Sequence, residues 1–253
     1  MIFENNDPKV EVPQKDLTSV VLQRANELGK KPALIDGVSG RTLSYSELRQ
    51  QVNHLATGLH QRGFSKGDVC AVFCPNMPEY ATIFLGVALI GGINTTVNSL
   101  YSINDLVHQF KDSNAKFLIT IPGFMDRALP AAKKCGIEEV FVLGEADGAT
   151  PFSELLSNDG NPPEVAIDSK NDLVALPYSS GTTGLSKGVM LTHENLVSDM
   201  VLTTSINTLT DDDVLIGVLP FFHIYGMVLI LNLAIFKGVT LVTMPRFDLE
   251  QFL

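Results

Sequence analysis

The sequence predicts an α/β fold in which a mostly parallel sheet is flanked by helices. Strand-like apolar segments alternate with helical segments along the 253 residues, and such strand–helix–strand units place helices on the faces of a parallel sheet. Hydrophobic residues make up 45% of the chain and charged residues 18%, which supports a substantial core. No repeat of short fixed period is present, which excludes solenoids and propellers.

The first α/β portion, about residues 1–165, opens with helical apolar spacing and a short hairpin. Ser44 and Glu47 have capping-box spacing, which predicts the start of a long helix, and Gly63 predicts its end. Buried strand-like runs then alternate with helical runs. In order, we expect a helix over 17–28, strands over 33–37 and 41–45, a helix over 44–63, a strand over 68–74, a helix over 78–92, a strand over 93–97, a helix over 102–112, a strand over 116–121, a helix ending near 136 and a strand over 139–144.

A linker is expected at 144–171, because this segment contains several acids and the turn-rich run NDGNPP, with one short helix-like stretch at 152–156. A second α/β portion starts at about residue 172. Its expected elements are strands over 173–178, 188–191 and 214–220, helices from 192 and over 226–238, and an amphipathic helix that begins at 248. That last helix stops about one turn after it starts, without a cap.

Charge and cysteine content exclude several classes of function. Lys and Arg number 18 against 28 Asp and Glu, a formal net charge of −10. Nucleic-acid binding needs a basic footprint, so we expect no nucleic-acid partner, although a local site for a small anion stays open. Cys70, Cys74 and Cys135 match neither a disulfide framework nor a zinc spacing, and Cys70 and Cys74, in or beside a buried strand, lack a charged neighbour that would make a nucleophile.

The absence of a secretory signal at the N-terminus and the unpaired cysteines together favour a cytoplasmic protein. A peroxisomal location would require a C-terminal signal beyond this chain. The sequence does not indicate an oligomeric state.

One segment is long enough to suggest a membrane span. From Val214 to Phe236 there is no Lys, Arg, Asp or Glu for 23 residues. Pro220, His223 and Asn232 interrupt this run, and its composition changes from strand-like to helix-like. We therefore expect a buried strand followed by a buried helix, and no membrane span.

The most informative segment is LPYSSGTTGLSKGVMLTHENL, residues 176–196. Its loop from Ser179 to Ser186 contains two glycines and five hydroxyl side chains, and Lys187 follows it. Exposed backbone N–H groups, hydroxyls and one mobile ammonium are the groups that hold a polyphosphate, and glycine permits close approach of the backbone.

Other interpretations of this loop are weaker. A Walker A loop would need Gly at Ser186 and Ser or Thr at Gly188, and no G-x-G-x-x-G of a dinucleotide-binding fold follows the strand. A flexible Ser/Gly turn between two strands is the remaining alternative. Such turns rarely combine this density of hydroxyls with an embedded lysine and sharply hydrophobic flanks.

The segment YSSGTTGLSKGVMLTHENL resembles the phosphate-loop signature of the adenylate-forming superfamily, which includes acyl-CoA synthetases, 4-coumarate–CoA ligases and firefly-type luciferases. PFFHIYGM at 220–227 resembles the histidine–aromatic segment of the coumarate ligase-like members, and LSYSELRQQVNHLATGL, PNMPEY and LGVALIGGINTTVN resemble N-terminal blocks of the family. One departure is Ser186, where many members have proline. The resemblance covers nearly the whole chain and implies the large N-terminal domain of that fold, with stacked sheets.

The resemblance implies that members join a carboxylate to ATP, release pyrophosphate, and hold an acyl-adenylate for attack by the thiol of CoA. It implies ATP, Mg²⁺ and CoA as cofactors and a small carboxylic acid, aromatic (4-coumarate-like) or fatty, as substrate. The implied ATP-phosphate ligands are Ser179, Ser180, Gly181, Thr182, Thr183, Gly184 and Lys187. Donors fixed around the departing pyrophosphate would stabilise the charge that develops there. No metal ligand is assigned, because the family's glutamate for magnesium has no match here.

His223 is the implied catalytic residue, near the substrate carboxylate or the acyl-adenylate. A lone histidine in an apolar run is otherwise a satisfied core residue. The resemblance also implies that Ile224, Tyr225 and Gly226 shape the acyl pocket, against plain packing at a helix start. Arg246 would contact CoA, against a surface charge before a helix.

The remaining histidines have simpler explanations. His193 is expected at a helix N-terminus, and His54, His60 and His108 are expected on helix surfaces.

The family's aromatic–glycine–x–threonine–glutamate segment, its ribose-binding aspartate, its hinge and the catalytic lysine of its small C-terminal domain have no match in this sequence. Residues 1–253 are therefore expected to be an incomplete N-terminal AMP-binding domain of an acid–thiol ligase, about half of an enzyme. The alternative is a non-catalytic fragment that binds a nucleotide or a partner.

Overall fold

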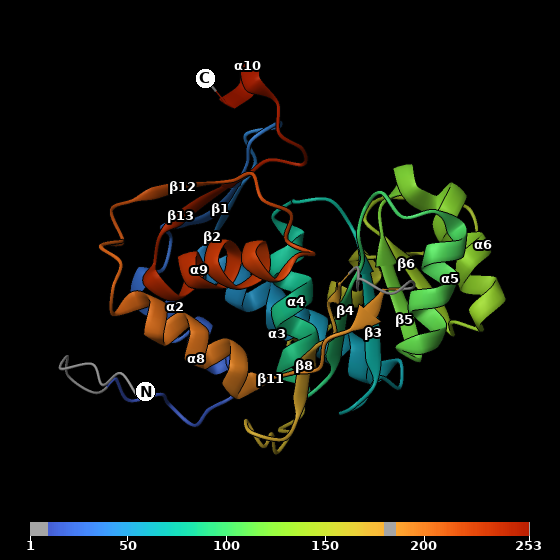
Figure 1. The fold of residues 1–253 in the computed structure, drawn as a ribbon, viewed down its shortest axis with the longest axis horizontal. Coiled ribbons are helices and arrows are strands. Elements are labelled where there is room, and N and C mark those ends of the chain that lie inside the picture. Colours follow the sequence, from blue (N-terminus) through green and yellow to red (C-terminus); the bar gives the residue numbers. More distant parts are fainter. Residues whose placement is uncertain (1–9, 180–185, 253) are drawn as a thin grey trace, which may run out of the picture.

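Two β-sheets, with helices between and outside them, make up the architecture of the computed structural model, which describes residues 10–179 and 186–252 (Figure 1). Within these residues, one sheet has the order β11-β8-β4-β3-β5-β6-β7 and the other the order β12-β13-β1-β2. A short ribbon, β9–β10, is separate from both sheets. The expected α/β fold with mostly parallel sheets flanked by helices is confirmed.

The larger sheet is parallel except where β11 pairs antiparallel with β8. Its central strand β3, VCAVF, is buried at all five positions, as expected for a strand covered on both faces. The strands of this sheet are β3 (Val69–Phe73), β4 (Ile93–Thr96), β5 (Ala115–Thr120), β6 (Glu139–Val142), β7 (Thr150–Pro151), β8 (Leu173–Ala175) and β11 (Leu191–Thr192).

Each face of this sheet packs on its own helices. Cys70 and Val72 of β3 lie in the core beneath α3 (Tyr45–Gln61) and α4 (Glu79–Leu89), which separate the two sheets in Figure 1. Alternate β3 residues pack on the opposite face against α5 (Ile103–Asp112) and α6 (Met125–Cys135). The long helix starts at the predicted capping box of Ser44 and Glu47.

The smaller sheet combines strands from both ends of the chain: β1 (Pro32–Asp36), β2 (Thr42–Ser44), β12 (Val214–Gly217) and β13 (Thr240–Thr243). β1 and β2 form the expected hairpin, and β13 runs parallel to both β1 and β12. The portions before and after residue 165 therefore share both sheets, since β8 and β11 likewise join strands of the first portion.

The expected helix over 17–28 and the expected linker over 144–171 differ in the structure. The prediction of one helix over 17–28 is wrong, because Leu22 caps α1 (Leu17–Val21) and a turn separates α1 from α2 (Ala25–Leu28). The two short helices pack on different neighbours, α1 against α4 and α8 (His193–Thr204), and α2 against α3. The linker over 144–171 contains β7, which extends the sheet, and α7 (Ser153–Leu156), which packs on α3.

The helix expected over 226–238 starts with π-helical turns at Gly226–Asn232 and continues as α9 (Leu233–Lys237). The Asn232 side chain donates to the carbonyl of Met227, five residues earlier, and Gly238 ends the helix with a φ of +82°. Other elements are a 3₁₀ turn at Pro122–Phe124, β9 (Tyr178–Ser179), β10 (Lys187–Gly188) and α10 (Leu249–Phe252). Across the described parts of the chain, every helix is too short or too polar to cross a membrane.

Candidate active site

The two strands expected around the glycine-rich loop are each divided between two pairings. β8 and β11 belong to the large sheet, whereas β9 and β10 pair only with each other. The change occurs at Pro177, which has no N–H for a sheet ladder, while its carbonyl accepts from the N–H of Val189 at 2.8 Å. The expectation of two continuous strands is therefore wrong, and the loop is carried on a separate ribbon.

This ribbon holds both ends of the loop. Lys187 lies opposite Ser179, and Gly188 lies opposite Tyr178, with the Ser179 and Lys187 side chains exposed. The ribbon follows the carboxyl end of β8, which is parallel to β4, and ligands of α/β sheets bind at that edge. The other predicted phosphate ligands, outside the described residues, are Ser180, Gly181, Thr182, Thr183 and Gly184.

A cavity of about 360 Å³ lies beside the ribbon. Most of the side chains that line it are apolar or aromatic, and hydroxyl, amide and imidazole groups lie among these side chains. It is lined by Asn98, Tyr101, Pro177, Tyr178, Ser179, Val189, Leu191, Phe222, His223 and Ile224. The structure therefore brings three predicted residues together, Ser179 from the loop and His223 with Ile224 from the histidine segment.

His223 is exposed at this cavity, and its ring orientation is set locally. Its Nδ1 accepts a hydrogen bond from the backbone N–H of Tyr225 at 3.3 Å. In the neutral ring the proton therefore lies on Nε2, which can donate to an oxyanion. The carbonyl of His223 accepts from the N–H of Met227 at 2.9 Å, so the histidine starts the following helix.

Asn76 fixes the chain that leads to His223. Its Nδ2 donates to the carbonyls of Gly217 and Leu219, both at 2.9 Å, and its Oδ1 accepts from the N–H of Phe221 at 2.8 Å. With all three groups paired, this buried amide ties the β3–α4 connection to the segment after β12.

Thr96 supports the next residue. At the end of β4 its hydroxyl donates to the carbonyl of Phe222 at 2.8 Å, one residue before His223. Neither Asn76 nor Thr96 was identified from the sequence as a site residue. The available signal was a polar side chain at the carboxyl end of a buried parallel strand.

Four other predicted residues that the structure describes do not line this cavity: Lys187, Tyr225, Gly226 and Arg246. Tyr225 is 50% exposed. Gly226 is buried against the preceding turn, where a Cβ would come within 2.1 Å of the Pro220 carbonyl oxygen, so it shapes the start of the helix. Arg246 is exposed in the connection between β13 and α10 and does not line the cavity.

His193, Cys70 and Cys74 lie in the core, whereas His108 contacts the residue before β10. His193 is at the N-terminus of α8, as predicted, and is buried, with Nδ1 accepting from the N–H of Leu17 at 3.0 Å. His108 was expected on a helix surface, but it is half-buried on α5 and contacts the carbonyl of Ser186. Burial raises the pKa of the Cys70 and Cys74 thiols, which agrees with their exclusion as nucleophiles.

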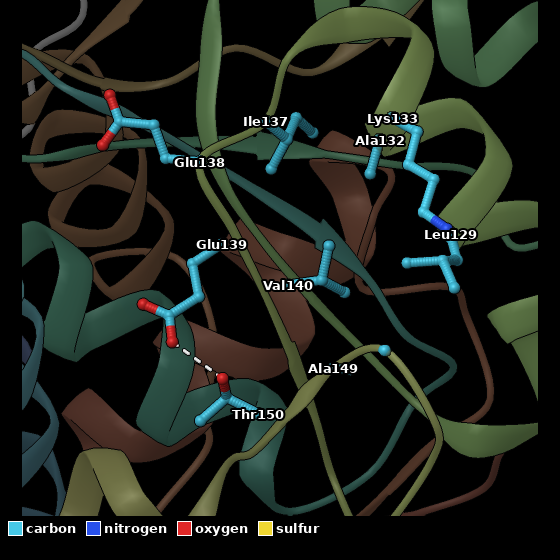
Figure 2. A pocket seen from close by; sticks show the side chains of 10 residues that line it. Leu129, Ala132, Lys133, Ile137, Glu138, Glu139, Val140, Ala149 and Thr150 are labelled. Atoms are coloured by element: carbon cyan, nitrogen blue, oxygen red, sulfur yellow. Dashed lines mark hydrogen bonds between the residues drawn. The ribbon is translucent and has the colours of Figure 1, made fainter.

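A second cavity, of about 440 Å³, lies between α6 and the β6–β7 edge of the large sheet (Figure 2). The Glu139 carboxylate that enters it accepts from the Thr150 hydroxyl at 2.7 Å and is also paired with Arg62. Among the predicted site residues that the structure describes, none lines this cavity. The candidate active site is therefore the cavity beside the ribbon.

Comparisons with known proteins agree with the sequence resemblance. A sequence model of the family described as "AMP-binding enzyme" matches residues 21–253. The 4-coumarate–CoA ligase 2 of Petroselinum crispum is 36% identical over 259 residues, which cover 100% of this chain and 47% of that ligase.

Solved structures give the same result. A long-chain-fatty-acid–CoA ligase from Archaeoglobus fulgidus matches 98% of this chain and 50% of its own, with a TM-score of 0.88 and 26% identity. The inhibitor-bound N-terminal domain of FACL13 from Mycobacterium tuberculosis matches 94% of this chain and 59% of its own, with a TM-score of 0.85 and 26% identity.

The present chain spans about half the length of the curated relatives that it matches. The family match covers more than nine-tenths of the chain, including the ribbon and the histidine segment. The chain therefore belongs to the family of AMP-binding enzymes.

Proposed function

We propose that this chain provides the phosphate-binding loop and part of the acyl pocket of an acid–CoA ligase. The carboxylate would attack the α-phosphorus of ATP and displace pyrophosphate, and the thiol of CoA would then take the acyl group from the acyl-adenylate and displace AMP. The observation that supports the proposal is the cavity that Ser179 and His223 both line, with Lys187 paired opposite Ser179 on the ribbon.

The chemistry of each group fits this reaction. The Lys187 ammonium and the hydroxyl of Ser179 would neutralise the charge that develops on the departing pyrophosphate. The Nε2–H of His223 would donate to the substrate carboxylate or to the acyl-adenylate that replaces it. Each group would act by binding and orienting the reactants and by stabilising charge, which is how enzymes catalyse phosphoryl transfer from nucleoside triphosphates.

The acid would be aromatic or fatty. Tyr101, Phe222 and Ile224 give the cavity apolar walls, and a flat ring or an alkyl chain would bury its surface against them. The relatives compared above are named for 4-coumarate and for long-chain fatty acids, which are these two classes.

CoA and Mg²⁺ complete the proposed reaction. Exposed Arg246 would meet a phosphate of CoA. The described residues contain no group of three or more His, Cys, Asp or Glu side chains placed to hold a metal ion, so Mg²⁺ has no ligand assigned among them. A cytoplasmic location is part of the proposal, and cell fractionation would test it.

Substitution Lys187→Ala tests the phosphate assignment. We expect ATP affinity, measured by calorimetric titration of the chain, to fall about ten- to a hundredfold, because a charge-assisted contact is lost. Lys170→Ala is the matched control, because Lys170 is an exposed lysine that precedes the amino end of β8, whereas the ribbon follows the carboxyl end of β8. Equal ATP affinity in Lys187→Ala and the wild type would contradict the proposal.

ATP–pyrophosphate exchange tests the reaction itself. The chain would be assayed with 4-coumarate and with a long-chain fatty acid, and exchange with either acid would support adenylation by these residues. Loss of the exchange in His223→Ala, with ATP affinity retained, would place His223 at the acyl side of the reaction.

A further inference from the structure

Helix α5 makes two side-chain contacts at the ribbon, one to β9 and one to the residue directly before β10. The Tyr178 hydroxyl on β9 donates to Oδ2 of Asp112 at 2.5 Å. Nε2 of His108 lies 2.8 Å from the carbonyl oxygen of Ser186, the residue directly before β10. His108 and Asp112 are four residues apart on α5, so both side chains lie on the same face of the helix.

The donors and acceptors in these contacts are fixed by chemistry. A carbonyl oxygen can only accept, so Nε2 of His108 carries a proton and donates to Ser186. Burial and the bond to Asp112 raise the pKa of Tyr178, so the phenol stays protonated and continues to donate. The His108 and Tyr178 rings also meet edge to face, with centroids 6.3 Å apart, which joins the two contacts.

The contacts matter because the ribbon is short. β9 and β10 contribute two residues each, and a two-stranded hairpin is marginally stable without further packing. Gly188 packs against the Tyr178 ring, where a Cβ would come within 3.2 Å of its carbon atoms. Holding Ser186 and Tyr178 on one helix therefore sets the position of Lys187, which lies opposite Ser179.

We propose that His108 is a positioning residue for the ribbon that carries Ser179 and Lys187, and that Asp112 assists it. The two side chains tie both strands at the base of the loop to α5, so that Lys187 and Ser179 meet the phosphates of ATP without first having to be ordered. This inference rests on the proposed function of the loop.

His108→Ala, His108→Gln and His60→Ala, each made in the full chain, test the proposal. The amide of Gln can still donate from the position of Nε2, and exposed His60 on α3 is a matched control. Calorimetric titration with Mg-ATP and with inorganic pyrophosphate should give about three- to tenfold weaker binding for His108→Ala. Binding by His108→Gln and His60→Ala should stay within about twofold of the wild type.

A second measurement needs no nucleotide. Tryptic cleavage after Lys187, followed by mass spectrometry, reports how firmly the ribbon is held. Cleavage should be several-fold faster in His108→Ala and in Asp112→Ala. It should be close to wild type in His108→Gln and in Asp112→Asn, which keeps an acceptor for Tyr178. Equal thermal midpoints would show that the substitutions act locally.

The outcomes separate the two proposals. If the wild type binds Mg-ATP and His108→Ala binds it with the same affinity, the positioning role is overturned and the proposed function of the loop stands. A wild type that binds neither ATP nor pyrophosphate overturns the phosphate assignment, and the cleavage rates then decide alone whether α5 holds the ribbon. If His108→Gln behaves like His108→Ala in both measurements, the hydrogen bond to Ser186 is not the cause and the inference fails.

Discussion

Gly226 stands at the point where the chain turns from the histidine segment into the π-helical segment. A methyl group there would lie 2.1 Å from the Pro220 carbonyl oxygen and 3.0 Å from the Leu219 carbonyl oxygen, so the backbone leaves it no room. We expect Gly226→Ala to lower the free energy of unfolding by about 3 kcal/mol, as overpacking does, and to displace His223.

Urea denaturation measures this loss. Gly123→Ala is the matched control, because a Cβ at Gly123 meets nothing closer than 3.8 Å and should change stability by less than about 1 kcal/mol. Equal stability of the two variants would mean that the turn relaxes freely.

His193 makes the stability of the protein depend on pH. Burial lowers its pKa, a shift that nearby Lys66 adds to and that Asp16 and Asp172 oppose. The folded state therefore takes up this proton at lower pH than the unfolded state, whose histidine titrates near 6.5. The contribution to stability is complete above about pH 6.5 and is lost as pH falls toward the lowered pKa.

We expect the free energy of unfolding to fall between pH 7.5 and 5.5 in the wild type, and to fall less in His193→Asn. The Oδ1 of Asn can still accept from the N–H of Leu17, so the substitution removes the titration and keeps the contact. Urea titrations at both pH values measure the difference, with His60→Asn as the control. An unchanged pH dependence in His193→Asn would assign the effect to other groups.

At the scale of elements, Asn76 joins two connections that carry the site. Its three hydrogen bonds hold the segment between β12 and the π-helical segment at Gly226–Asn232. Removing the buried amide leaves two backbone carbonyls and one backbone N–H without these partners. We expect Asn76→Ala to cost about 3–5 kcal/mol of stability and to shift the NMR signals of the His223 ring.

Asn161→Ala is the matched control for this substitution, since Asn161 is exposed in the connection before β8. Its effect should lie within about 0.5 kcal/mol. A loss in Asn76→Ala no larger than in this control would contradict the role assigned to the amide.

At the scale of the whole molecule, neither portion of the chain completes its own sheets. β1 depends on β13, and β4 depends on β8, across the boundary near residue 165. We expect residues 1–165 produced alone to lack a cooperative thermal transition, because edge strands and core residues of both sheets lose their partners. Co-production with residues 166–253 should restore the transition. Cooperative unfolding of 1–165 alone would show that this portion folds independently.

Most helices and strands could be predicted from the sequence, because local interactions determine where they begin and end. The capping box at Ser44, the continuous apolar run of β3 and the cap at Gly238 act through neighbours within a few residues, so they could be predicted. Ser179, Lys187 and His223 stay predicted site residues, because their residue types and order resemble a family signature.

Pairing between distant segments was decided by the tertiary structure. The hydrogen bonds of Asn76, Thr96 and His108 reach backbone groups that lie far away in sequence, and the two short helices on either side of Leu22 pack on different distant helices. Nothing in the spacing of residues reports which carbonyl a buried amide or imidazole will meet. The sequence by itself determined the fold class and predicted the chemistry of the loop, whereas the structure decided how the β9–β10 ribbon is held, because long-range hydrogen bonds exist only once the chain has folded.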